Sequence, residues 1–226
     1  VTFKRIATAM GFSPMAKANL AEVHRIAQRC DAQMYVFHIG EWNDRCETTY
    51  TGFLSDLGIP KSDVELVCKE GDPKEELRLL CQENNIDLLA LGALVRENMF
   101  KVFTVSIARD VCRKAKVSLL LLTHSRVEGM PCERIVVNGL DHPKTLDTIR
   151  TSLWLGSKLG SKELFVVDEL SEKSLIKPDD DKSQLKSERK RKQIEREQHS
   201  RIEDLLQNCQ VPVNLDIKEQ HVFGKR

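Results

Sequence analysis

Residues 86–123 constrain the fold of this chain more than any other stretch. Two apolar runs of strand length, residues 86–91 and 117–122, flank a segment in which apolar residues recur at helical spacing. Two strands around one helix form a β-loop-α-β unit with a parallel pair of strands. Ligands of open parallel sheets bind at the carboxyl ends of the strands, so the loop after Leu91 is the first place to expect a site.

The residues before this stretch repeat the alternation of strand and helix. Further strands are predicted at residues 5–9, 34–39 and 64–68, and helices at 14–30, 43–57 and 75–84. Ser13 and Pro14 suit the N-cap and first position of the first helix, and Asp72 suits the N-cap of the third. The pattern predicts an α/β fold with an open parallel five-stranded sheet and helices on both faces, of the Rossmann-like type.

The pattern begins again after residue 132. Lys4-Arg5-Ile6 matches Glu133-Arg134-Ile135 at an offset of 129, and Pro14 matches Pro143 at the same offset. An ungapped comparison also places residues 34–38 on residues 163–167, strand on strand. The second copy is therefore predicted to contain a strand at 135–138, a helix at 144–159, and strands at 163–168 and 213–217.

The second copy has no counterpart of residues 74–123 and so lacks two strands and two helices. It also carries a highly charged segment that we interpret as an inserted helix. The sequence predicts a complete domain at residues 1–125, a linker at 126–132, and an incomplete second domain at 133–226 with the charged insertion at 170–208.

Composition excludes several classes of function. The charges of the 226 residues nearly balance at +1, which argues against a nucleic-acid partner. No apolar run approaches the roughly 18 residues of a membrane span. The seven cysteines are scattered without a CxxC pair, which favours a reduced, cytoplasmic setting and disfavours a zinc site.

Residues 92–106 follow a phosphate-binding pattern with two departures. The pattern is Gly-x2-Gly-x9-Gly-Ser/Thr. Gly92 matches its first glycine and Ser106 matches its hydroxyl residue, but Val95 and Val105 replace the other two glycines. The turn at residues 11–14, Gly-Phe-Ser-Pro, matches an Asp-Phe-Ser-Pro turn except for its acid. With these motifs the chain resembles the universal stress protein family, as a tandem of one complete and one incomplete domain.

The resemblance implies a crevice that binds a nucleotide, ATP or AMP, between the turn after the first strand and the loop after the fourth. The implied lining residues are Gly11, Phe12, Ser13, His38, Gly92, Val95, Arg96, Val105 and Ser106. For His38 the favoured explanation is backbone hydrogen bonding at the sheet edge, and for Arg96 it is solvation on a loop.

The departures bear on affinity. Glycine lets the backbone approach a phosphate closely and adopt positive φ, and valine opposes both. Gly11 also removes an acid that could hold a ribose or a metal. The sequence therefore disfavours tight ATP binding and leaves another nucleotide, another anion or no ligand open.

Three functions remain open. The first is a cytoplasmic stress-response or regulatory protein without catalysis, because no catalytic constellation or Walker motif is present. The second is an ATP- or AMP-binding protein with slow ATPase activity. The third is a soluble regulatory domain of a larger protein such as a membrane transporter, because the first residue is Val1.

The sequence also predicts assembly. The strand at residues 117–122 is apolar and has no second-copy partner, and a bare edge of this kind invites pairing. We expect a homodimer, or a partner chain, through this strand.

Overall fold

The computed structural model describes residues 2–92, 117–171 and 181–224. The chain packs as two compact units, residues 3–130 and residues 131–226 with residues 1–2. We call these the first and the second unit.

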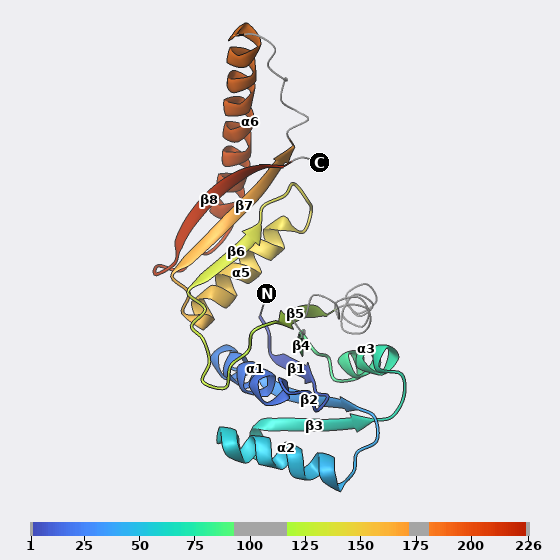
Figure 1. Cartoon of the computed structure of the whole chain (residues 1–226). Helices are drawn as coiled ribbons and strands as arrows, with labels where there is room; N and C mark the ends of the chain where they lie inside the picture. The colour runs from blue at the N-terminus through green and yellow to red at the C-terminus, as the bar shows by residue number, and fades with distance from the viewer. Residues whose placement is uncertain (1, 93–116, 172–180, 225–226) are drawn as a thin grey trace. The chain divides into compact units, whose positions relative to one another are not determined.

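The first unit alternates strands and helices, as predicted (Figure 1). Its elements are β1 (Arg5–Ala9), α1 (Ala16–Cys30), β2 (Gln33–Ile39), α2 (Asp44–Leu57), the 3₁₀ turn η1 (Lys61–Asp63), β3 (Val64–Lys69), α3 (Pro73–Glu83), β4 (Leu88–Gly92) and β5 (Ser118–Leu122). The strands form one parallel sheet in the order β3-β2-β1-β4-β5. This confirms the predicted five-stranded parallel sheet, while the predicted helix before β5 lies outside the described residues.

Both faces of this sheet are covered. On one face, α3 packs Leu77 and Leu80 against Ala7, Phe37 and Leu89. The neighbouring strand residues point to the opposite face, where α1 contacts β1, β2 and β4. The chain runs from β1 outward to β3 and then returns to β4 beside β1, and right-handed crossovers in opposite directions place α1 and α3 on opposite faces.

Side-chain caps explain where two helices begin. The Asn43 side chain accepts from the Cys46 N–H at the start of α2, and Asp72 accepts from the Glu75 N–H at the start of α3. The prediction that Ser13 and Pro14 open the first helix is wrong. The Ala16 N–H donates to the Ser13 carbonyl at 2.9 Å, so residues 13–16 form a turn, and α1 starts at Ala16 without a side-chain cap.

The second unit is a three-stranded parallel sheet with two helices (Figure 1). Its elements are β6 (Arg134–Asn138), α5 (Thr145–Leu159), β7 (Glu163–Ser171), α6 (Asp181–Gln207) and β8 (Asp216–Gly224). The bounds of β6 and α5 are those of β1 and α1 moved by 129 residues. The charged helix α6 connects β7 to β8, just as α2 connects β2 to β3 in the first unit.

Two predicted details of the second unit need correction. In the sheets Ile6 lies beside Met34 but Ile135 lies beside Leu164, so the ungapped comparison is off by one residue in β7. The extra residue lies in the loop between α5 and β7, where the N–H groups of Lys162 and Glu163 both donate to the Glu133 carbonyl. The third strand also begins at residue 216 rather than 213.

The two helices of the second unit cover the same face of its sheet. Ile149 and Leu153 of α5 and Ile202 of α6 share one buried cluster with Leu164 and Val166 of β7. Because β6, β7 and β8 follow one another in one direction, right-handed crossovers place both helices on one side.

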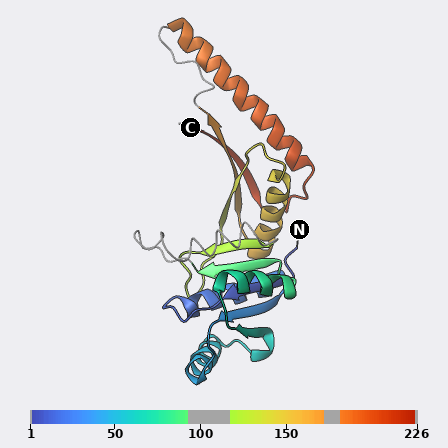
Figure 2. The ribbon, with the colours of Figure 1, turned by 90° about the vertical axis from the view of Figure 1, so that its right-hand side faces the viewer.

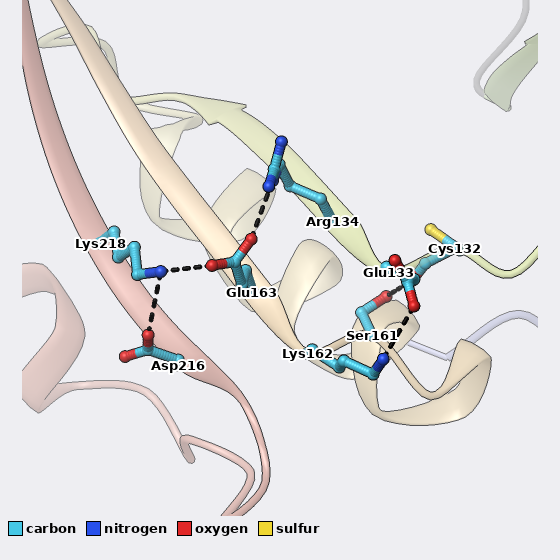
Figure 3. A network of polar contacts seen from close by, with 8 residues as sticks. All are labelled: Cys132, Glu133, Arg134, Ser161, Lys162, Glu163, Asp216 and Lys218. Atoms are coloured by element: carbon cyan, nitrogen blue, oxygen red, sulfur yellow. Dashed lines mark hydrogen bonds and ion pairs between the residues drawn. The ribbon is translucent and has the colours of Figure 1, made fainter.

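The other face carries a polar ladder (Figure 3). Glu163 of β7 accepts from Arg134 of β6 at 2.9 Å and from Lys218 of β8, which also pairs with Asp216 at 3.3 Å. Both cations lie over the Phe165 ring, 5.3 and 5.5 Å from its centroid. This ladder ties the three strands together on the side that α5 and α6 leave open.

Candidate ligand crevice

A cavity of about 180 Å³ opens at the carboxyl ends of the central strands of the first unit. It lies at β1 and β4, between which the strand order reverses, and ligands of open α/β sheets bind at such a point. Its lining comes from β1 and the turn after it, α1, and the ends of β4 and β5: Thr8, Ala9, Met10, Gly11, Ser13, Met15, Ala16, Asn19, Leu20, Gly92, Leu122 and Thr123.

The first turn of α1 faces this cavity. Helix N-termini present unsatisfied N–H groups and a partial positive charge. Here no side chain caps the helix and the first turn holds no acidic residue. Neutral polar side chains from Ser13, Asn19 and Thr123 join it in the lining. The cavity can therefore offer hydrogen bonds and a weak positive potential to a small polar or anionic molecule.

Gly92 is in close contact with a side chain of α1. A Cβ built at this position would lie 2.1 Å from Nδ2 of Asn19, far inside van der Waals contact. Gly11 differs, because a Cβ there would meet nothing within 4 Å. The glycine after β4 thus permits α1 to pack closely, while the glycine after β1 leaves open space where an acidic side chain could stand.

His38 belongs to an aromatic cluster at the end of β2. Its Nδ1 lies 3.0 Å from the Met10 carbonyl oxygen and the residue is buried. The ring lies 5.5 Å from Phe12 and 5.1 Å from Trp42, and Trp42 in turn contacts Tyr50. Burial raises the pKa of Tyr50 to about 12. A backbone contact and aromatic packing therefore account for His38.

The structure brings together part of the predicted site. Gly11, Ser13 and Gly92 line the cavity, while Phe12 and His38 form the neighbouring aromatic cluster. Val95, Arg96, Val105 and Ser106 lie outside the described residues. Sequence reasoning missed Thr8, Asn19 and Thr123. For Asn19 a signal existed, since it is a polar residue between Ala16 and Leu20 in the buried stripe of α1.

None of the lining residues that the structure describes is ionisable. Within the same described ranges, no three His, Cys, Asp or Glu side chains are grouped so as to hold a metal ion. The described helices also include none that is long and apolar enough to pass through a membrane.

The fold and the crevice define a class, the doubly wound α/β domain with a ligand crevice where the strand order reverses. Comparison gives the family: the model of the Universal stress protein family matches residues 53–123, which run from α2 to the end of β5. The match covers 71 of the 226 residues, and it supports the family predicted from the motifs. No curated protein sequence matches the chain.

One solved structure supports the fold, and two further structures are similar to part of the chain. A putative universal stress protein from Pseudomonas aeruginosa UCBPP-PA14 is 12% identical, with 96% of this chain and 74% of that chain covered and a TM-score of 0.57. A universal stress protein in complex with cAMP is 16% identical, with 56% of this chain and 100% of that chain covered and a TM-score of 0.47. The universal stress protein from Archaeoglobus fulgidus in complex with dAMP is 20% identical, with 54% of this chain and 98% of that chain covered and a TM-score of 0.37. At these identities the likeness concerns the fold alone.

Proposed function

We propose that the first unit is a regulatory domain that senses a small anionic ligand in the crevice and catalyses no reaction there. The observation that carries this proposal is the cavity of about 180 Å³ at the reversal of strand order. Pockets that enclose drug-sized ligands measure roughly 300–1,000 Å³. The crevice therefore suits a ligand, or the anionic part of one, smaller than a nucleoside triphosphate.

The lining supports an anion rather than a cation. The uncapped start of α1 contributes partial positive charge, and Asn19 contributes an amide that can donate. No carboxylate lies among the described lining residues to repel an anion. Inorganic phosphate and AMP are the simplest probes of anion binding in the crevice. AMP is chosen because of the motifs around Gly92.

The same lining supports a role without catalysis. General acid–base chemistry needs an ionisable side chain within hydrogen-bond reach of the substrate, and a metal-bound triphosphate usually needs an acid. Gly11 stands where such an acid would follow β1, and Val95 and Val105 replace two glycines of the phosphate pattern. A role in the stress response and a cytoplasmic location are part of the proposal, on the family alone.

Isothermal titration of the chain with AMP and with phosphate tests the proposal. In Gly11→Leu the new side chain projects into open space at the crevice, so it should fold normally and weaken binding about tenfold, or about 1.4 kcal/mol. Gly52→Leu is the matched control, because a Cβ at Gly52 also meets nothing within 4 Å but lies on α2. Absence of binding, equal binding by Gly11→Leu, or sustained phosphate release from ATP would contradict the proposal.

A further inference from the structure

The N-terminal half of α6 carries basic side chains along one face. Lys186, Arg189, Lys192 and Arg196, which we call the basic stripe, follow one another at intervals of three, three and four residues. This spacing keeps residues on one side of an α-helix. All four are exposed, whereas the opposite side of α6 holds the half-buried or buried Ile194, Gln198 and Ile202.

The basic stripe lies on the part of the helix that projects from the second unit. Figures 1 and 2 both show the first turns of α6 extending beyond the ends of β6 and α5. From Lys186 to Arg196 the stripe covers ten residue steps, or about 15 Å of helix rise. A partner of this length can reach all four side chains at once.

The nearby acids do not neutralise the stripe. Glu195 is engaged by Arg191 at 3.1 Å, and Glu197 accepts from Gln193 at 2.9 Å. In the described ranges, no ion pair joins a stripe residue to a carboxylate. Residues 184–192 contain five basic residues and one acidic residue, Glu188, for a net charge of +4.

This arrangement is unfavourable for the helix by itself. Like charges three or four residues apart on a helix repel one another. A polyanion beside the stripe would reverse this effect. The charge pattern therefore points to a polyanionic surface.

The sparse apolar residues favour nucleic acid over lipid. A helix that lies on a membrane needs a broad apolar face, and between residues 184 and 193 the one apolar side chain is Leu185. Double-stranded DNA presents one charge per roughly 1.7 Å of axis and a major groove about 12 Å wide that admits a helix. We propose that the basic stripe binds the phosphate backbone of double-stranded DNA without reading base sequence.

The nearly neutral total charge predicts no nucleic-acid partner because it averages over the whole chain. The stripe places four cations on one exposed side of α6, whereas Glu188, Glu195 and Glu197 of the same helix are not part of the stripe. Backbone binding depends on local rather than total charge.

Fluorescence anisotropy of the whole chain with a labelled DNA duplex of arbitrary sequence, over a salt series from about 50 to 200 mM, tests the proposal. The stripe variant carries Lys186→Gln, Arg189→Gln, Lys192→Gln and Arg196→Gln. The control variant removes four other exposed cations through Arg45→Gln, Lys61→Gln, Lys144→Gln and Lys158→Gln. Glu188→Gln raises the local positive charge and should tighten binding.

The logarithm of the wild-type affinity should fall linearly with the logarithm of the salt concentration. The stripe variant should lose about 3.6 units of that slope, since each of its four phosphate contacts contributes about 0.9. The control variant should keep the wild-type slope, and circular dichroism should show unchanged helix in all variants. Equal slopes for wild type and stripe variant, looser binding by Glu188→Gln, no DNA binding at the lowest salt, or binding to phosphatidylserine vesicles in place of DNA would overturn the proposal.

Discussion

The side chain of Asn19 packs on the backbone of Gly92, so that a Cβ at position 92 would lie 2.1 Å from the Asn19 Nδ2. This contact joins the first turns of α1 to the carboxyl end of β4, the two elements between which the candidate crevice opens. The glycine that opens the phosphate-binding pattern therefore has a packing role as well.

The first prediction concerns this contact. Gly92→Ala should destabilise the chain by about 1–3 kcal/mol, because the added methyl group forces Asn19 or the helix to move. Thermal or denaturant unfolding measures the change, and Gly11→Ala is the control, since its methyl group meets nothing. Asn19→Ala in the Gly92→Ala background should restore most of the loss; no restoration would show that Asn19 is not the obstacle.

The second prediction concerns the ion pair of Asp168 and Arg201 in the second unit. Their side chains are 4% and 23% exposed and lie 3.0 Å apart, and Arg201 also donates to the Gly139 carbonyl. Arg201→Met should cost about 3–5 kcal/mol, because it leaves a buried carboxylate without its cation. Adding Asp168→Leu should recover part of this loss in a double-mutant cycle. Additive losses would contradict a direct coupling between the two residues.

The third prediction concerns two histidines with opposite pKa shifts. The hydrogen bond to Glu219, at 2.7 Å, raises the pKa of His199, whereas burial lowers the pKa of His24. The His199 contribution to stability is therefore full below the unfolded pKa and is lost as pH rises through the raised value. The His24 contribution is lost as pH falls, because the unfolded chain binds its proton more readily.

Nuclear magnetic resonance titration of the histidine ring protons measures both pKa values directly. Glu219→Gln should lower the pKa of His199 and leave that of His24 unchanged. A pKa for His199 below that for His24 in the wild type would contradict the assignment.

The fourth prediction concerns assembly through β5. In the part of the chain that the structure describes, β5 has a strand neighbour on one side alone, and Leu121 is 49% exposed. We expect a dimer through this strand, and Leu121→Lys should shift it to monomer, because charged side chains on an edge oppose pairing. Light scattering at micromolar concentration tests this. A monomeric wild type would refute it.

Local chemistry made much of the fold predictable. Asn43 and Asp72 marked the starts of their helices because a short polar side chain bonds to the N–H three residues on. Gly58 marked the end of α2 because its φ of +64° suits glycine. The start of α1 was mispredicted because Ser-Pro serves a turn as readily as a helix cap, and here the turn prevails.

Details that depend on tertiary packing could not be predicted from the sequence. The one-residue shift in β7 arises from an extra residue before the strand, where two successive N–H groups donate to the Glu133 carbonyl. An ungapped comparison cannot represent such an extra residue. In the crevice, Gly11 and Gly92 were predictable from a motif. For Asn19 the sequence offered a polar residue in the buried stripe of α1, but its contact with Gly92 arises only when α1 meets the end of β4.

The central claim is that this crevice does not hold ATP tightly. Isothermal titration of the whole chain with ATP and magnesium measures this most directly. Because Val95 and Val105 stand in the phosphate pattern and the cavity beside Gly92 is small, we expect no dissociation constant in the micromolar range. Micromolar binding of ATP that disappears in Gly11→Leu and persists in Gly52→Leu would contradict it.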